Sequence, residues 1–108
     1  MTYAIEFPYL ANDTACATVS TWEGWKDWSW HNDACPNFVS DEYSLWCDAE
    51  NVSEREYVTT ARYSLCPAED VGEYTVPLLE TDNFEDIVAY IFEGKRGFPV
   101  WVYEGDDA

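Results

Sequence analysis

"DNFEDIVAYIFEG", residues 82–94, is the stretch that most clearly predicts the fold, because it carries the signals of one amphipathic helix. Asp82 suits the N-cap with Glu85 three positions later, and Gly94 suits the position just beyond the helix end. We therefore predict a helix over about residues 83–93 with one apolar face that must pack against another element. The apolar residues at helical spacing are Phe84, Ile87, Val88 and Ile91.

Much of the remaining chain alternates between apolar and polar residues, which is the pattern of half-buried strands. Residues 42–48 and 55–65 alternate most clearly, and the short polar link between them predicts an antiparallel hairpin. Pro77 cannot donate to a strand ladder, so a strand at residues 73–79 is expected at an edge or to end there. The sequence predicts an α+β fold: an antiparallel sheet of four to six strands with the helix packed on one face. Further strands are expected at residues 3–7, 15–21 and 98–104.

The length of 108 residues suits one domain, and 47% of the residues are hydrophobic, which is enough to build a core. We expect a single acidic domain over residues 1–108 whose tail, residues 105–108, is frayed. No apolar run approaches the roughly 20 residues of a membrane helix, and the N-terminus lacks the regions of a secretory signal. The expected compartment is the cytoplasm, that of the host cell if a phage encodes the chain.

The charge balance is the strongest functional signal, with 22 acidic residues against five Lys and Arg and a net charge of −17. Affinity for nucleic acid comes largely from Lys and Arg, so direct DNA or RNA binding is excluded. Three explanations of the excess remain open. The chain lives in high salt, or it is acidic for solubility, or its carboxylates face a basic surface on another protein.

Four cysteines, Cys16, Cys35, Cys47 and Cys66, are spaced without any close C-x-x-C pair. Structural zinc sites usually draw their ligands from such close pairs, so four reduced and mostly buried thiols are favoured. One or two disulfides, or a zinc site that uses His31 with Cys35, remain alternatives. No cofactor and no metal are expected.

Catalysis has little support in the sequence, and we do not expect an enzyme. His31 is the one histidine, with Asp27 or Asp33 available to orient it and Cys35 one helical turn away. A surface histidine in a polar loop is the favoured interpretation. Among 22 acidic residues some pair always resembles a catalytic dyad, so paired carboxylates carry almost no information.

Tryptophans and carboxylates are mixed in "TWEGWKDWSWHND", residues 21–33, where we expect a short helical turn or an irregular loop. At least two of its four tryptophans are expected in the core, because large rings fill a small core efficiently. An exposed ring among acids suits a partner rich in Arg and Lys, since a guanidinium group stacks on an indole and pairs with a carboxylate at once. The candidate partner-binding rings are Trp28 and Trp30.

Two acidic runs in the middle of the chain are the candidate partner-binding surface. Carboxylates spaced along a strand or helix approximate a row of phosphates and attract a basic protein over long range. The alternative is a solvated acidic face with no partner. The candidate residues are Asp41, Glu42, Asp48, Glu50, Glu54, Glu56, Glu69, Asp70, Glu73, Glu80, Asp82, Glu85 and Asp86.

In size and charge, though in no particular motif, the chain resembles the small DNA-mimicking anti-restriction and anti-CRISPR proteins of phages and mobile elements. The resemblance implies an inhibitor that blocks a basic nucleic-acid-binding protein or nuclease complex, as a DNA mimic or by covering a basic hotspot. An immunity protein that neutralises a toxin nuclease is the first alternative. A carbohydrate-binding module and a halophilic housekeeping domain are further alternatives.

Overall fold

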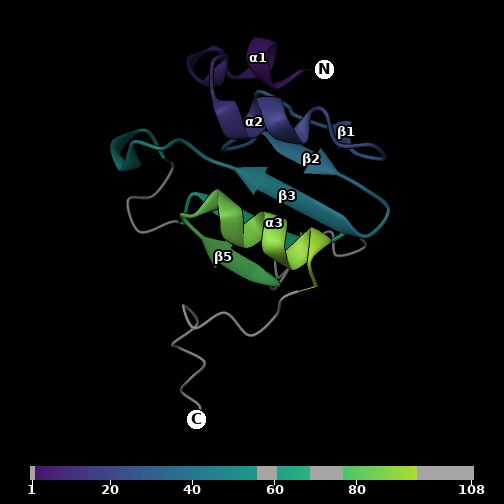
Figure 1. The fold of residues 1–108 in the computed structure, drawn as a ribbon. Coiled ribbons are helices and arrows are strands. Elements are labelled where there is room, and N and C mark those ends of the chain that lie inside the picture. Colours follow the sequence, from purple (N-terminus) through teal and green to yellow (C-terminus); the bar gives the residue numbers. More distant parts are fainter. Residues whose placement is uncertain (1, 56–60, 69–76, 95–108) are drawn as a thin grey trace.

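The centre of the molecule is an antiparallel sheet, and the segments that alternate most clearly in the sequence form its middle (Figure 1). The computed structural model describes residues 2–55, 61–68 and 77–94 of the protein. Within these residues five strands pair in the order β1-β2-β3-β4-β5, so each strand lies beside the one that follows it in the chain. The strands are β1 Lys26–Asp27, β2 Asn37–Val39, β3 Tyr43–Cys47, β4 Tyr63–Pro67 and β5 Leu79–Thr81.

The antiparallel hairpin predicted from residues 42–48 and 55–65 is confirmed as the pair of β3 with β4. Leu45 of β3 lies opposite Leu65 of β4, and both residues are fully buried. Alternation along each strand therefore gives one face to the core, as the sequence pattern predicted. Residues 56–60 of the predicted second strand lie outside the described part of the chain.

The edge position that Pro77 predicted for this part of the chain is occupied by β5, the last strand in the order. The predicted strand at residues 73–79 overlaps β5 only at Leu79, and most of its other residues lie outside the described part. The strand predicted at residues 98–104 and the tail at 105–108 also lie outside it.

The predicted helix is confirmed as α3, Phe84–Phe92, which packs against β4 and β5. Its N-cap is Asn83 and not Asp82, because the Asn83 side chain accepts a hydrogen bond of 3.1 Å from the backbone N–H of Glu85. The helix therefore begins one residue later than the predicted capping box. Gly94 has a φ of +68°, the left-handed conformation that ends helices and that glycine adopts without strain.

The strands predicted at residues 3–7 and 15–21 are wrong, because both segments are helical: α1 is Tyr3–Glu6 and α2 is Thr14–Val19. The start of α2 is fixed by Asp13, whose side chain accepts a hydrogen bond of 2.9 Å from the backbone N–H three residues later. Acidic N-caps of this kind satisfy the unpaired donors of a first helical turn. The threonines that favoured a strand lie within or just after this short capped helix.

Burial explains why the alternation of the first segment misleads. Ile5 is 74% exposed whereas Phe7 is 4% exposed, so the two residues do not share a buried face. Phe7 leads instead into the 3₁₀ turn η1, Pro8–Leu10, and a second 3₁₀ turn, η2, spans Val52–Glu54. Phe7 packs with Leu10 in a small cluster beside the main core.

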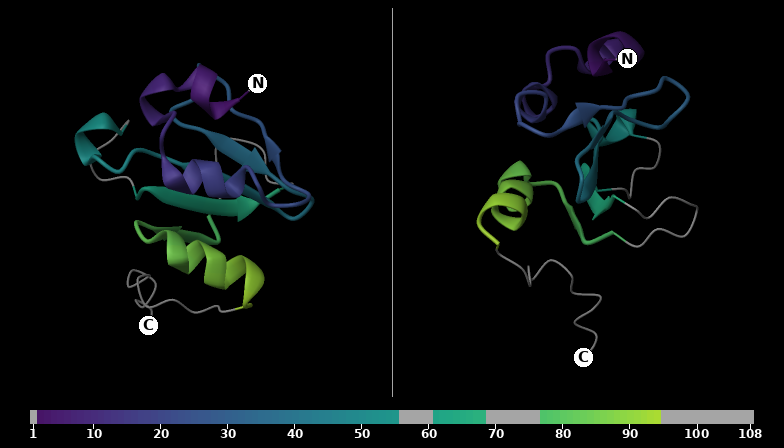
Figure 2. Two further views of the ribbon diagram at one scale, coloured as in Figure 1. Left: turned by 45° about the horizontal axis from the view of Figure 1, so that its top comes forward. Right: turned by 90° about the vertical axis from the view of Figure 1, so that its right-hand side faces the viewer.

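The main core lies between the sheet and two helices, because α2 and α3 cover the same face of the sheet (Figure 2). Among the helices of the described part, none has the length and apolar character required to cross a lipid bilayer. The buried residues of this core are Ala15, Cys16, Val19, Phe38, Leu45, Cys47, Tyr63, Leu65, Leu79 and Ile87.

The tryptophan segment, residues 21–33, is irregular apart from the short strand β1. The prediction of at least two core tryptophans is met only in part, because two rings in the first half pack against the core but are partly buried. Trp22 stacks on Phe84 of α3 with ring centroids 5.8 Å apart, and Trp25 stacks on Tyr43 of β3 at 6.4 Å. These contacts join the loop after α2 to both the helix and the sheet.

Candidate functional site

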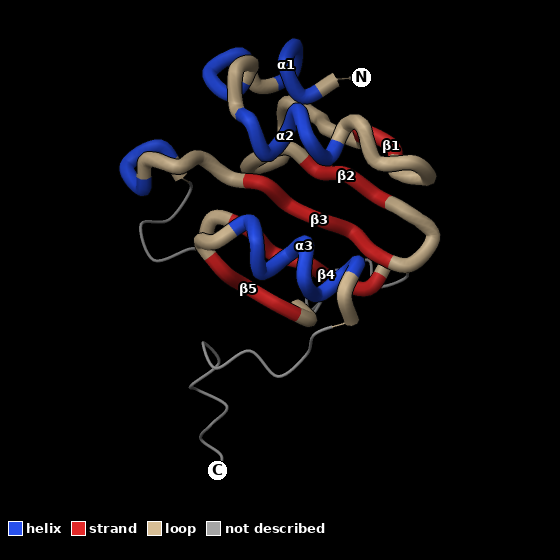
Figure 3. The backbone as a smooth tube through the Cα atoms, in the orientation of Figure 1, coloured by secondary structure: helices blue, strands red, loops and turns tan. Residues whose placement is uncertain are grey.

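The candidate site lies at the end of the sheet where β3 and β5 finish and β4 begins (Figure 3). Antiparallel pairing places Cys47 opposite Tyr63, and Tyr63 opposite Thr81. The N-termini of α2 and α3 and the turn η2 come to the same end. We call this region the acidic end. Its carboxylates are Asp13, Asp48, Glu50, Glu54, Asp82, Glu85 and Asp86.

Arg55 lies inside the acidic end, with a side chain that is only 4% exposed. Its Nε donates to the carbonyl oxygen of Ala49 at 2.6 Å, and its Nη2 donates to the carbonyl of Glu50 at 3.2 Å. Nη1 lies 3.3 Å from Asp82 Oδ1. The guanidinium group therefore fixes the loop after β3 and connects it to the end of β5.

Arg62 is the second inward cation, with a side chain that is 14% exposed. Its Nη2 forms an ion pair with Asp13, and its Nε donates to the carbonyl oxygen of Asp48 at 3.2 Å. The guanidinium carbon lies 4.9 Å from the centre of the Tyr63 ring, which is cation–π distance. The backbone N–H of Arg62 also donates to Asp82 Oδ1 at 2.7 Å.

Several acids of this end stabilise the fold. Asp48 is 4% exposed and accepts from the backbone N–H of Ala49 at 2.7 Å, so it offers little surface to a partner. Asp86 accepts a hydrogen bond of 2.7 Å from the Thr81 hydroxyl, which joins α3 to β5. Asp82 holds both arginines, as described above, although its own side chain is 68% exposed.

Besides Asp82, the exposed acids among the described residues of this end are Glu50, Glu54 and Glu85. None of these latter acids takes part in the three ion pairs found among the described residues. The two arginines are directed inward, so they leave the negative charge of these outer carboxylates uncompensated. The acidic end thus has its cations beneath its surface and its anions on it.

The other predicted site residues are distributed elsewhere. Asp41 and Glu42 lie in the turn between β2 and β3, at the opposite end of the sheet. Glu80 lies on β5 between two buried residues, so its side chain points to the face away from the helices. The predicted residues outside the described part of the chain are Glu56, Glu69, Asp70 and Glu73.

Trp28 and Trp30 are both exposed, at 59% and 41%, in contrast to the first two tryptophans of their segment. The backbone N–H of Trp28 donates to the carbonyl of Asn37 at 2.8 Å, which places Trp28 beside the start of β2. This is the same end of the sheet as the acidic end, but at the edge that β1 forms. The Trp28 ring is therefore available to a partner that approaches this end, whereas Trp30 packs on His31.

His31 contacts Glu6 and neither of the two aspartates that could orient it. Its Nδ1 lies 2.7 Å from Glu6 Oε1, and its ring packs on Trp30 with centroids 4.2 Å apart. The hydrogen bond from His31 lowers the pKa of Glu6 below its usual value. Asp27 instead accepts from the backbone N–H of Tyr3 at 2.7 Å, so it fixes the start of the chain.

All four cysteines lie within the described part of the chain, where they are buried and form no disulfide. Burial, followed by a hydrogen bond with Cys16, raises the pKa of Cys47 well above its usual value. Both effects keep Cys47 a neutral thiol inside the core. Among the described residues, no group of three or more His, Cys, Asp and Glu side chains could hold a metal ion.

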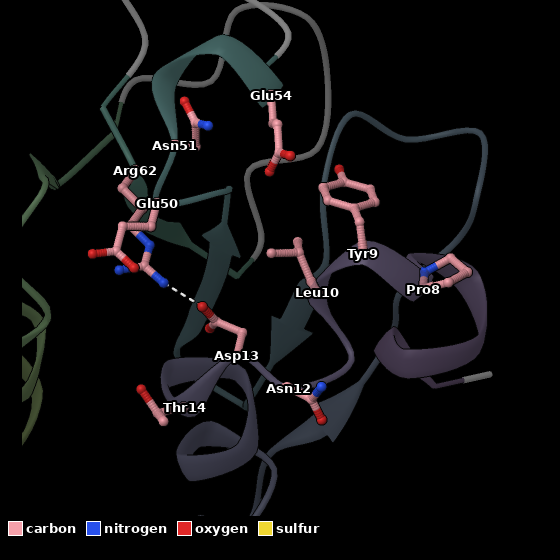
Figure 4. Close-up of a pocket in the computed structure, with 10 residues that line it drawn as sticks. All are labelled: Pro8, Tyr9, Leu10, Asn12, Asp13, Thr14, Glu50, Asn51, Glu54 and Arg62. Atoms are coloured by element: carbon pink, nitrogen blue, oxygen red, sulfur yellow. Dashed lines mark hydrogen bonds and ion pairs between the residues drawn. The ribbon is translucent and has the colours of Figure 1, made fainter.

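The acidic end contains an open pocket of about 640 Å³ between η1, the start of α2 and η2 (Figure 4). Sequence reasoning missed its N-terminal wall, because it assigned strands on both sides of it. The signal that could have found this wall is the aspartate directly before a short helix. The pocket is lined by Pro8, Tyr9, Leu10, Asn12, Asp13, Thr14, Glu50, Asn51, Glu54 and Arg62.

Comparisons with protein-family models, with curated proteins and with solved structures find no match for this chain.

Proposed function

We propose that the protein is a small acidic inhibitor that binds and blocks a basic nucleic-acid-binding protein or nuclease complex through its acidic end. The observation that carries this proposal is the inward placement of Arg55 and Arg62 beneath exposed carboxylates. An acidic chain that needs only solubility gains nothing from gathering its exposed acids over buried cations. A surface that must attract lysine and arginine side chains does gain from it.

The electrostatics favour a basic protein as the partner. Uncompensated carboxylates such as Glu50, Glu54 and Glu85 repel nucleic acid and attract its binding proteins over long range. Like charges gathered at one end also lower the stability of the fold by mutual repulsion. The cations of a bound partner would remove this repulsion. This attraction should speed association and weaken steeply with salt.

The acidic end is also rigidly built, which supports specific binding. The Arg55 side chain binds two backbone carbonyls and Asp82, so the loop that bears Glu50 is held before any partner arrives. Preorganised groups lose less conformational freedom on binding. In this proposal the carboxylates act as a DNA mimic or cover a basic hotspot, as in phage anti-restriction and anti-CRISPR proteins. The site of action is the cytoplasm.

Charge reversal at the two ends of the sheet tests the proposal. Glu50→Lys with Glu54→Lys changes the acidic end, and Asp41→Lys with Glu42→Lys is the matched control at the opposite end, with the same change in net charge. Each protein is used for affinity capture from host extract at about 50 mM and about 300 mM salt. The captured protein is then assayed for nucleic-acid binding with and without the inhibitor.

The parent should recover a basic nucleic-acid-binding protein at low salt, release it at high salt and block its function. Reversal at the acidic end should lower capture by about tenfold or more, whereas the control pair should lose far less. Trp28→Ala should also have a smaller effect than reversal. If the acidic-end variant inhibits as well as the parent, the electrostatic mechanism is wrong.

A further inference from the structure

The pocket of the acidic end is open to solvent and large enough to admit a long side chain of a partner. Its volume is about 640 Å³, and it opens to solvent between the N-terminal turn η1 and the turn η2 (Figure 4). Two segments that are far apart in sequence thus form its walls.

One wall of the pocket is aromatic. Tyr9 follows Pro8 in η1, is 50% exposed and borders the opening. Its ring meets Phe7 edge-on, with centroids 6.3 Å apart and an angle of 80° between the planes, and this contact restrains its orientation. Burial, followed by nearby negative groups that include Asp48 and Glu54, raises the pKa of Tyr9 above its usual value. The ring is therefore a neutral phenol at physiological pH.

The opposite wall is anionic. The Glu54 carboxylate points toward Tyr9 across the pocket, and Glu50 is a further acidic lining residue (Figure 4). Glu54 is held in η2, where the Asn51 side chain accepts hydrogen bonds from the backbone N–H and the hydroxyl of Ser53, at 3.0 and 2.9 Å. Two exposed carboxylates and one half-exposed ring thus surround the same space.

The Arg62 guanidinium, which is the cation among the lining residues, already binds other groups of the protein. The Arg62 guanidinium binds Asp13 and the carbonyl of Asp48 and covers the Tyr63 ring. Its positive charge is thereby balanced by Asp13, which leaves Glu50 and Glu54 for a cation that comes from outside. A ligand with negative charge would meet net repulsion at this position.

The arrangement also distinguishes between kinds of cation. The described residues hold no group of three or more acidic, His or Cys side chains that could bind a metal ion, and so the pocket does not fit one. A lysine ammonium is a compact point charge, whereas a guanidinium group is planar and can stack on a ring while it donates to carboxylates. Tyr9 together with Glu50 and Glu54 offers both interactions.

We propose that this pocket receives an arginine side chain of the basic partner, with its guanidinium group against Tyr9 and its N–H groups directed to Glu54 and Glu50. This inference rests on the proposed function and adds the residue type that the acidic end recognises. It makes the pocket the specific part of an otherwise diffuse electrostatic surface.

Titration of the isotope-labelled full chain with three blocked tripeptides tests the proposal by nuclear magnetic resonance. The peptides are glycine-arginine-glycine, the same peptide with lysine, and the neutral isostere with citrulline. The arginine peptide should shift the resonances of Tyr9, Asn51 and Glu54 most. It should bind about fivefold more tightly than the lysine peptide, and the citrulline peptide should produce no saturable shift.

Three variants and a control locate the interaction. Tyr9→Leu and Glu54→Gln should each weaken binding of the arginine peptide by about fivefold, whereas Tyr9→Phe keeps the ring and should bind as the parent does. Glu85→Gln removes one charge from the same end without touching the pocket, and should have little effect. All three residues are exposed, and the amide spectrum of each variant verifies that the fold is intact.

The outcomes separate this inference from the proposed function. Equal binding of the arginine and lysine peptides, or shifts that are as large at Glu85 as in the pocket, would overturn the arginine pocket while leaving capture of a basic partner intact. Selective binding of the arginine peptide, together with partner capture that survives charge reversal at the acidic end, would support the pocket and defeat the inhibitor mechanism.

Discussion

The two ends of the sheet carry the same residue type in different arrangements. At the acidic end, Arg55 and Arg62 lie beneath the carboxylates and hold loops and strand ends together. At the opposite end, Asp41 and Glu42 lie in a short turn that the Ser40 hydroxyl stabilises by accepting the backbone N–H of Glu42 at 3.3 Å. Acids at one end thus form ion pairs with inward-directed arginines, whereas Asp41 and Glu42 at the other end take part in none of the ion pairs found among the described residues.

The largest effect should come from removing a buried cation. Arg55→Ala leaves the carbonyls of Ala49 and Glu50 without the Arg55 donors and removes the ion pair of Asp82, and should lower the free energy of unfolding by about 2–4 kcal/mol. Lys26→Ala removes an exposed cation near the opposite end and should stay within about 0.5 kcal/mol. Urea unfolding measures both, and equal losses would show that the two ends do not differ.

A smaller effect is expected at the start of α2. Asp13→Ala removes both the N-cap and the partner of Arg62, and should cost about 1–2 kcal/mol, whereas Asp41→Ala should be near neutral. Asp13→Asn retains a good capping side chain and loses the charge, so it separates the two contributions. Thermal unfolding at low salt compares the three variants. An Asp13→Asn variant as unstable as Asp13→Ala would assign the loss to the ion pair.

Removing the exposed acids should stabilise the protein slightly. Glu50→Gln with Glu54→Gln relieves repulsion among carboxylates and should raise the free energy of unfolding at low salt by roughly a few tenths of a kcal/mol. The gain should vanish at about 0.5 M salt, where the charges are screened. Asp41→Asn with Glu42→Gln is the matched change at the opposite end and should gain less. If the Asp41→Asn with Glu42→Gln variant gained more free energy of unfolding, the stronger repulsion among carboxylates would lie at the opposite end and not at the acidic end.

The smallest effect concerns pH and the contact of Glu6 with His31. Because this contact lowers the pKa of Glu6 in the folded state, its stabilisation is complete above the usual glutamate pKa and is lost as the pH falls through the lowered value. Between about pH 5 and pH 3, the melting temperature of the Glu6→Gln variant should therefore fall by less than that of the parent. His31→Ala removes the other partner of this contact and should reduce the pH dependence in the same direction.

The spacing of apolar residues was sufficient to predict those helices and strands in which the same spacing continues over many residues. The helix now seen as α3 and the hairpin of β3 with β4 were both predicted, because apolar spacing and burial agree in them. The first segment could not be predicted in this way, because a short apolar alternation fits a helix as well as a strand. There Ile5 remains exposed and the cap at Asp13 determines the structure.

The candidate site was predicted only as a charge pattern. The sequence placed acids in two runs, and it could not show that Asp48 and Asp86 serve the fold or that Tyr9 joins the surface. These assignments depend on contacts between distant residues, such as the ion pair of Asp13 with Arg62 across 49 positions. No local pattern encodes such a pairing.

The strand order has a consequence for how the chain folds. Since each described strand pairs with its successor, the sheet can grow stepwise, one strand after another, as the chain leaves the ribosome. The bridge from Arg62 back to Asp13 is the late exception, because it closes only after β3 has been made. Nascent chains stalled before Arg62 should therefore already contain the β2–β3 hairpin and still lack the ion pair with Asp13.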